Sequence, residues 1–256
     1  MAPPKDKKKF VFWAYPETLN KVKELYHDTA SGINVDQYEL GHMTGSAGVY
    51  VRAYEGEPMG SIYGTGYVRD DNGNVKIQDG LPVSESEVYL GSVQPDFTGS
   101  FGLNFDWKGL SANALFSFKK GGKLFSVTEY AAAHAGTALR TAERDNFTFQ
   151  GTKMDAQAFW TSAPAEEFMY DASFLKLGEA SIGYNLSRKT LENFLGGIVK
   201  SAKVSIYGSN LLYLISHTPG TTPDGSSTDT SIFATAFDMC PYPSTRNFGA
   251  SITIGF

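Results

Sequence analysis

Strict alternation of apolar and polar residues constrains this chain more than any other feature. Over 101–107 the two sets are Phe101, Leu103, Phe105 and Trp107 against Gly102, Asn104 and Asp106. Successive side chains of a β-strand point to opposite faces, so this segment predicts a strand with one apolar and one polar face. The alternation resumes over 110–119 after a tight turn at 108–109, which predicts a β-hairpin. Leu115 breaks the pattern.

The C-terminal residues repeat the alternation. The apolar set is Phe248, Ala250, Ile252, Ile254 and Phe256, and the set between them is polar or glycine. Weaker patterns predict strands over 9–14, 49–54, 61–69, 173–186 and 203–215, which gives about eight strands in all. Within 173–186 the apolar phase slips at Gly178, where we expect a β-bulge.

Composition agrees with an all-β chain. Aromatic residues make up 14% of the 256 residues and there are 27 glycines, a combination typical of strands and turns. The formal charge of −5 argues against nucleic-acid binding. No apolar run is long enough for a transmembrane helix, and we expect no signal peptide after Met1. The single cysteine, Cys240, cannot form an internal disulfide.

The predicted connections alternate between short and long. The segments 55–59 and 108–109 are short, whereas 69–97, 120–172 and 216–246 far exceed the usual ceiling of about 15 residues for a loop. Outer-membrane barrels combine short periplasmic turns with long extracellular loops in this way. We therefore expect the three long connections outside the cell, and the segments 55–59, 108–109 and 187–202 in the periplasm. Helical pieces are expected at 128–144 and 188–195.

Five motifs, in order along the chain, resemble the C-terminal part of SusC/RagA-type TonB-dependent outer-membrane transporters of Bacteroidota. They are 57–63 (EPMGSIY), 90–97 (LGSVQPDF) with 106–110 (DWKGL), 170–186 (YDASFLKLGEASIGYNL), 208–212 (GSNLL) and 242–246 (YPSTR). The resemblance implies a partial antiparallel transmembrane β-barrel, about the last eight strands of a barrel of about 22. Residues 1–256 would then form one C-terminal barrel segment. We expect no plug domain and no TonB box in this chain.

The resemblance also implies a function and partners. The chain would be part of an outer-membrane nutrient importer that takes up oligosaccharides or peptides with a SusD-like surface lipoprotein. TonB would act through the plug region that this chain lacks, and outer-membrane lipid would surround the barrel. The last strand resembles the signal read by the outer-membrane insertion machinery, with Gly249, Ile252, Ile254 and Phe256 as its residues and with Ser251 and Thr253 on the opposite face.

No pattern for catalysis, a cofactor or a metal is visible. The four histidines lie far apart, and the oxygen-rich segment 70–74 fails the calcium-loop template because Val75 replaces the required glycine. Glu166 and Glu167 have no evident partner in the sequence, so we expect no enzyme activity. Trp160 and Tyr170 flank a long connection and are candidate ligand-stacking residues; the alternative is that Trp160 packs the loop or lies at the membrane interface.

A second class of function stays open from the sequence. A soluble carbohydrate-binding β-sandwich would also contain alternating strands. It requires two sheets whose apolar faces cover each other, and its strands are typically about five or six residues long. The segments predicted here are longer, which favours the membrane barrel.

Overall fold

The fold is described from a computed structural model, which covers the chain with gaps. The described residues are 37–42, 48–54, 57–145, 147–187, 190–191, 193, 198–223, 235–242 and 244–256. The strand expected at 9–14 and most of the helix expected at 188–195 lie outside these ranges. No helix among the described residues has both the length and the apolar character needed to cross a membrane.

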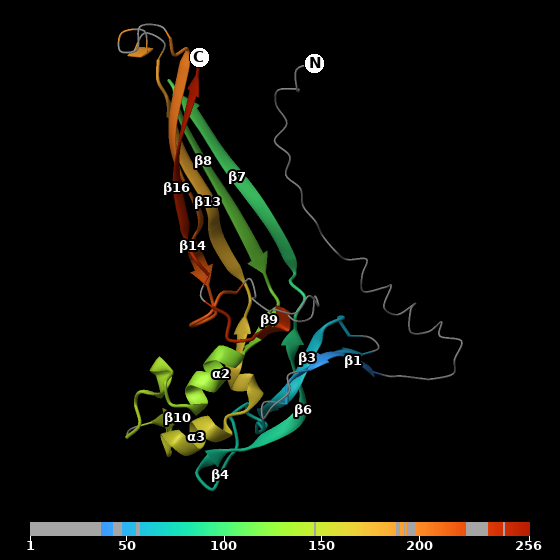
Figure 1. The fold of residues 1–256 in the computed structure, drawn as a ribbon. Helices are drawn as coiled ribbons and strands as arrows, with labels where there is room; N and C mark the ends of the chain where they lie inside the picture. Colours follow the sequence, from blue (N-terminus) through green and yellow to red (C-terminus); the bar gives the residue numbers. More distant parts are fainter. Residues whose placement is uncertain are drawn as a thin grey trace, which may run out of the picture.

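A five-stranded antiparallel sheet dominates the structure (Figure 1). Its order is β16-β14-β13-β8-β7. The strands are β7 (Phe97–Trp107), β8 (Leu110–Lys120), β13 (Phe174–Asn185), β14 (Ser201–Ser216) and β16 (Asn247–Gly255). All five coincide with segments predicted from alternation. Among the described strands, β7 and β16 each pair with a single neighbour in this sheet, so it is open at both edges.

The bulge predicted at Gly178 is confirmed. The pairing of β13 with both β8 and β14 shifts register between Leu177 and Glu179. The bulge returns Leu175 and Leu177 to the face that Ala180 and later apolar residues occupy, because Leu177 pairs with Phe116 and Ala180 with Ala114. One inserted residue therefore keeps the apolar side chains of β13 on one face along its whole length.

A second, four-stranded sheet corrects the prediction of a single sheet. Its order is β1-β2-β3-β6, with β1 (Gln37–His42), β2 (Tyr50–Tyr54), β3 (Ser61–Tyr67) and β6 (Ser84–Ser92). The segments 49–54 and 61–69 were expected to be barrel strands, but they belong to this sheet. The reason is that β3 pairs with β6, a strand inside the expected loop 69–97, and not with β7.

The described parts of the long connections are folded rather than open loops. Their remaining elements are β4 (Ile77–Gln78), β5 (Leu81–Pro82), β9 (Lys123–Ser126), α2 (Val127–His134), η1 (Leu139–Thr141), β10 (Thr148–Phe149), β11 (Thr152–Lys153), α3 (Ala156–Ser162), η2 (Ala165–Phe168), β12 (Met169–Asp171) and β15 (Phe237–Asp238). Together with the four-stranded sheet they form a compact unit below the long sheet in Figure 1. We call this unit, the described residues of 37–93, 121–173 and 235–242, the loop module.

The hydrophobic core lies in the loop module. It gathers side chains from all three of its segments, including Ile62, Phe125, Phe159, Phe168 and Phe237. The buried cluster that the structure describes includes no residue of the five-stranded sheet. The module therefore buries its own apolar surface, whereas the apolar side chains of the long sheet are left for another partner.

The two ends of the long sheet differ as predicted, with one correction. The turn at 108–109 lies at the same end as the C-terminus, and the described parts of the three long connections lie at the other end (Figure 1). The segment 55–59 was expected with the short turns. Gly60 instead accepts a hydrogen bond from the Val93 amide at 2.9 Å, just before β7 begins, so this turn lies on the module side.

Candidate functional site

One face of the five-stranded sheet is apolar from edge to edge. Cross-strand partners share a face, so the register assigns each side chain: Phe105, Ala112, Ile182, Ile206 and Ala250 form one row across all five strands. Many large side chains of this face are between 43% and 76% exposed, among them Phe97, Leu103, Phe105, Trp107, Ile182, Tyr184, Val204, Ile206, Phe248, Ile252 and Ile254. A solvent-exposed apolar surface of this extent indicates an interface with another apolar phase.

The opposite face is polar. It carries Asn104, Asp106, Ser111, Asn113, Ser117, Ser181, Asn185, Lys203, Ser205, Ser251 and Thr253. Side chains bond across strands there: Asn113 Nδ2 donates to Ser181 Oγ at 3.0 Å, and the Ser205 and Ser251 hydroxyls lie 2.8 Å apart. Leu115 is the apolar exception noted in the sequence, and it lies on this face with 42% exposure. The sheet is thus amphipathic over its whole width.

The residues expected to form the terminal signal lie on β16 and at the chain end. Ile252 and Ile254 pair with Val204 and Ala202 on the apolar face, whereas Gly249 pairs with Tyr207 on the polar face. Phe256 follows β16 and is 76% exposed. The predicted separation of these apolar residues from Ser251 and Thr253 is therefore present in the sheet.

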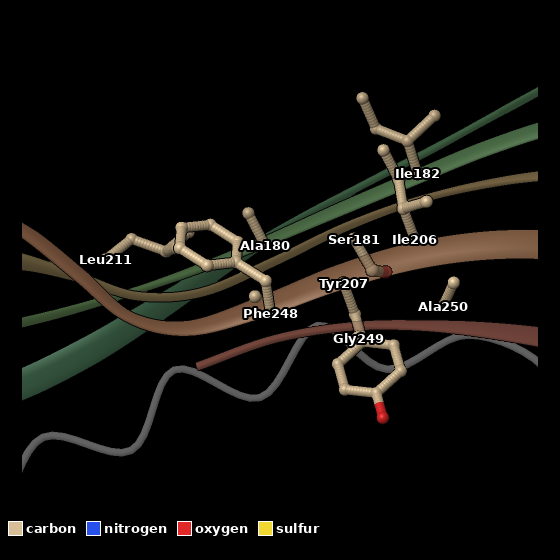
Figure 2. Close-up of a pocket in the computed structure, with 10 residues that line it drawn as sticks. Ala180, Ser181, Ile182, Ile206, Tyr207, Leu211, Phe248, Gly249 and Ala250 are labelled. Atoms are coloured by element: carbon tan, nitrogen blue, oxygen red, sulfur yellow. The ribbon is translucent and has the colours of Figure 1, made fainter. Parts of the chain in front are cut away.

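A shallow hollow of about 590 Å³ interrupts the sheet near mid-height (Figure 2). Small residues form its floor, because Ala180, Gly208 and Ala250 occupy neighbouring positions on β13, β14 and β16. The side chains of Leu211 and Phe248 lie at one end of it in Figure 2, and those of Ile182 and Ile206 lie at the other. The ring of Tyr207 points away from these isoleucines.

The buried carboxylate of Asp238, in the last long connection, binds groups at the start of α2. Asp238, which is 1% exposed, accepts a hydrogen bond from Ser126 Oγ at 2.5 Å and one from the Thr128 amide at 3.1 Å. The Thr128 hydroxyl also donates to it. Ser126 is itself the N-cap of α2, accepting from the Glu129 amide. Asp238 therefore satisfies groups at the helix N-terminus that would otherwise be buried without partners.

Arg140 joins three elements of the module. Its Nη1 donates to Glu167 of η2 at 3.2 Å, and its Nε lies 3.5 Å from Glu129 of α2. The guanidinium also lies over the rings of Trp160 and Phe168, at 4.7 and 4.8 Å from their centroids. A planar cation between two rings and two carboxylates combines charge pairing with cation–π contact.

Glu166 and Glu167 have partners in the structure that are not evident in the sequence. Glu166 accepts from the Tyr67 amide at 2.8 Å and pairs with Arg69 at 2.6 Å. Glu167 accepts from the Tyr67 hydroxyl at 3.0 Å as well as from Arg140. These partners lie 27 to 100 residues away in sequence, which is why the sequence did not reveal them. The hydrogen bonds from Tyr67 to these two glutamates connect η2 to β3.

The two glutamates have opposite pKa shifts. Burial is the largest influence on Glu167 and raises its pKa, although Tyr67 and Arg140 oppose this effect. Burial also acts on Glu166, but the hydrogen bonds from Arg69 and from the Tyr67 amide outweigh it and lower its pKa. As pH rises, the two neighbouring carboxyl groups therefore change the stability of the module in opposite directions.

The pH dependence of module stability follows from the shift of Glu167. A carboxyl group whose pKa is raised on folding binds its proton more tightly in the folded state, so stability should fall as pH rises through that pKa. Glu167→Gln should remove this decline above pH of about 4.5. The measurement is the opening free energy of β3 and η2 amides by hydrogen exchange at pH 5 and 7.5. An unchanged decline in the variant would contradict the assignment.

The two candidate ligand-stacking aromatics are not equally accessible. Trp160 is 6% exposed and packs in the core against Phe159 and Phe147, with ring centroids 4.9 and 5.5 Å away. Its position favours the packing alternative. Tyr170, on β12, is half-buried, and burial raises its pKa. The structure does not bring these two rings together as one platform.

The remaining polar clusters show ordinary structural contacts. Asp70 accepts hydrogen bonds from the amides of Asn72 and Asn74, both at 2.9 Å, as in a tight loop turn. Its pKa is lowered, mainly by the bond from Asn74. In the described ranges, no group of three or more His, Cys, Asp or Glu side chains is arranged to hold a metal ion.

Comparison with known proteins identifies related chains. No protein-family model matches. The chain is 25% identical over 210 residues to TonB-dependent receptor P3 of Formosa agariphila, an alignment that covers 79% of this chain and 19% of that protein. The chain therefore spans about a fifth of the length of this curated relative. The similarity confirms the resemblance drawn from the motifs.

Solved structures of the RagAB peptide importer have the same fold over part of their length. The open-open state matches with a TM-score of 0.59 and 22% identity, covering 89% of this chain and 25% of that one. The closed-closed state matches with a TM-score of 0.57 and 21% identity, over 88% and 25% of the two chains. At this level of identity the likeness shows a shared fold over about a quarter of the solved chain.

Proposed function

We propose, from the premise that this chain is a partial homologue of TonB-dependent receptors, that it forms the C-terminal barrel segment of an outer-membrane nutrient importer. In this proposal all 256 residues belong to one segment of a larger barrel. The five-stranded sheet lies in the membrane and the loop module lies outside the cell. The substrate would be an oligosaccharide or a peptide.

The observation that carries this proposal is the amphipathic sheet. Its apolar face has at least eleven large side chains that are 43% or more exposed, and no described element packs over them. Its polar face has hydroxyl and amide side chains suited to a water-filled lumen. An interior of this kind does not suit a small closed barrel, whose interior must be filled by side chains. In a segment of a wide barrel, the apolar face contacts lipid and the polar face lines a water-filled lumen.

The partners are proposed from the relatives. The matched solved structures are of a complex named RagAB, a peptide importer. By analogy, a SusD-like lipoprotein would sit on the loop module, whose packed core gives it a rigid surface. TonB would act through a plug region outside this chain, and outer-membrane lipid would contact the apolar face.

We further propose that β16 is the strand recognised during insertion into the outer membrane. Its outer edge has no partner among the described strands, so its backbone groups are available for β-augmentation. Gly249, Ile252, Ile254 and Phe256 would be the recognised residues. Ile252 and Ile254 share the apolar face, and Phe256 continues their alternation just after β16, which lets that face enter lipid while Ser251 and Thr253 face the lumen.

The soluble carbohydrate-binding sandwich is the weaker alternative. A sandwich requires a second sheet over the apolar face, and the described four-stranded sheet lies instead within the loop module, at one end of the long sheet (Figure 1). The strands of the long sheet also reach 16 residues, beyond the usual range of about three to ten for soluble proteins.

Accessibility to trypsin in intact cells tests the proposed orientation. Arg144 is exposed on the module, whereas Lys108 is exposed at the turn on the opposite end of the sheet. Trypsin added to intact cells that express the protein should cleave after Arg144 and spare the bond after Lys108. Permeabilised cells should be cleaved at both sites, which is the control. Cleavage after Lys108 alone in intact cells would reverse the orientation, and protection of both sites would argue against an outer-membrane position.

A further inference from the structure

The last two strands of the sheet carry the same dipeptide, an aromatic residue followed by glycine. On β14 it is Tyr207-Gly208, and on β16 it is Phe248-Gly249. The register sets Tyr207 opposite Gly249 and Gly208 opposite Phe248. Each strand therefore presents an aromatic ring to the other strand's glycine, in two adjacent pairs that lie on opposite faces of the sheet.

The ring of Tyr207 occupies the space over Gly249. A Cβ atom added to Gly249 would lie 2.5 Å from the Tyr207 hydroxyl oxygen and 2.9 Å from ring atom Cε2, closer than real Cβ contacts. Figure 2 shows the ring beside Gly249, on the side away from Ile182 and Ile206. The φ of Gly249 needs no glycine, so the glycine serves this close approach.

The other pair repeats the arrangement on the apolar face. A Cβ atom on Gly208 would lie 3.1 Å from Cδ1 of Phe248 and 2.6 Å from Cδ2 of Leu211. Phe248 and Leu211 thus cover Gly208 on the apolar face, as Tyr207 covers Gly249 on the polar face. Aromatic side chains across a sheet glycine restore the packing that the missing side chain would supply.

Alternation alone leaves the register of β16 ambiguous. A shift by one residue is excluded because it would turn Ile252 and Ile254 to the polar face. A shift by two residues keeps every apolar side chain on the apolar face and sets Ile252 opposite Ile206 or Ala202, both of them apolar. The pattern of the two strands therefore does not distinguish the observed register from these two neighbours.

We propose that the reciprocal pairs Tyr207–Gly249 and Gly208–Phe248 fix the register of the terminal strand. After a shift by two residues, Tyr207 would face Asn247 or Ser251, and the Cβ of either residue would occupy the space that the ring needs. Both glycines would also lose their covering rings. Any role of these pairs in membrane insertion rests on the proposed function. Their effect on the register concerns only the pairing of β14 with β16.

Disulfide crosslinking measures the register directly. The full chain carries Cys240→Ser so that introduced cysteines are the only thiols. Ser205→Cys with Ser251→Cys reports the observed register, since these residues are partners. Ser205→Cys with Thr253→Cys and Lys203→Cys with Ser251→Cys report the two shifted registers. Crosslinking is carried out in detergent micelles, where no membrane insertion is required, so this test is separate from that of the proposed function.

The observed-register pair should crosslink at least about tenfold more than either shifted pair. Tyr207→Ala combined with Phe248→Ala should reduce this ratio about tenfold, because both cross-strand pairs are lost. Tyr184→Ala, which removes a ring of the same sheet that faces Val204 rather than a glycine, should leave the ratio unchanged. An unchanged ratio in the double variant, or an equal loss in the Tyr184 control, would overturn the proposal.

A glycine substitution gives a second, independent measure. Gly249→Ala should lower the crosslinking ratio when Tyr207 is present, because its Cβ would meet the ring. In the Tyr207→Ala background the same substitution should have no further effect, because the space is empty. Equal effects of Gly249→Ala in the two backgrounds would show that the ring and the glycine do not act together, and would also overturn the proposal.

Discussion

Replacing Ile206 with arginine should sharply reduce the folded, membrane-inserted fraction of the protein, whereas Ser205→Arg should be tolerated. Ile206 is 59% exposed and lies on the apolar face of β14, near the middle of the sheet. Arginine on the lipid face of a barrel costs about 2 to 4 kcal/mol near the bilayer midplane. Ser205 is the next residue on the same strand but faces the polar side, where a charge stays hydrated.

Heat-modifiable gel mobility of protein refolded into phospholipid vesicles measures this difference. The two arginine variants are matched in strand, depth and added charge, so a difference between them reports the face alone. The pair Ile254→Asp and Thr253→Asp should show the same order with a smaller gap, because it lies close to the end of the sheet. Equal folded fractions for Ile206→Arg and Ser205→Arg would mean that the apolar face is not in lipid.

The second large effect is expected in the loop module. Arg140→Leu should lower module stability by about 3 kcal/mol, since it leaves the partly buried carboxylates of Glu129 and Glu167 without their shared cation. Arg140→Lys should restore only part of this loss, because a lysine ammonium supplies a cation but lacks the planar group that lies over Trp160 and Phe168.

Hydrogen exchange of the α2 and η2 amides reports this loss without interference from the sheet. Arg144→Leu is the matched control, because Arg144 is exposed and bonds only to the Gly136 carbonyl, at 3.2 Å, among the contacts described for its side chain. Its removal should cost less than about 0.5 kcal/mol. If Arg140→Leu changed protection no more than the control, Arg140 would not be the residue that joins these elements.

The five long strands were predictable because the apolar side chains of each strand lie on one face of the sheet. Alternation in β7 and β16 directly encodes an apolar and a polar face, and the phase slip at Gly178 encodes the bulge. The same logic missed β6. Its first residues, Ser84 to Glu87, are all exposed and polar, so the period of two carries no apolar signal there. Local pattern also could not show that β3 pairs with β6.

The contacts inside the module depend on residues far apart in the chain. Asp238 meets Ser126 across 112 positions and Tyr67 meets Glu167 across 100. Side chains of these types are common in exposed loops, so nothing local marks them as buried partners. The terminal strand was predictable in part. Its two faces followed from alternation, but the aromatic–glycine pairing became visible only when the register of β14 and β16 was known.

The most direct test of the central claim is the environment of consecutive side chains on β16 in a lipid bilayer. Spin labels at single cysteines replacing Ser251, Ile252, Thr253 and Ile254, in a Cys240→Ser background, report accessibility to oxygen in lipid and to a nickel chelate in water. The proposed orientation predicts alternation with a period of two: oxygen accessibility is high at positions 252 and 254, and nickel accessibility is high at 251 and 253. High nickel accessibility at all four positions would contradict a lipid-facing apolar surface.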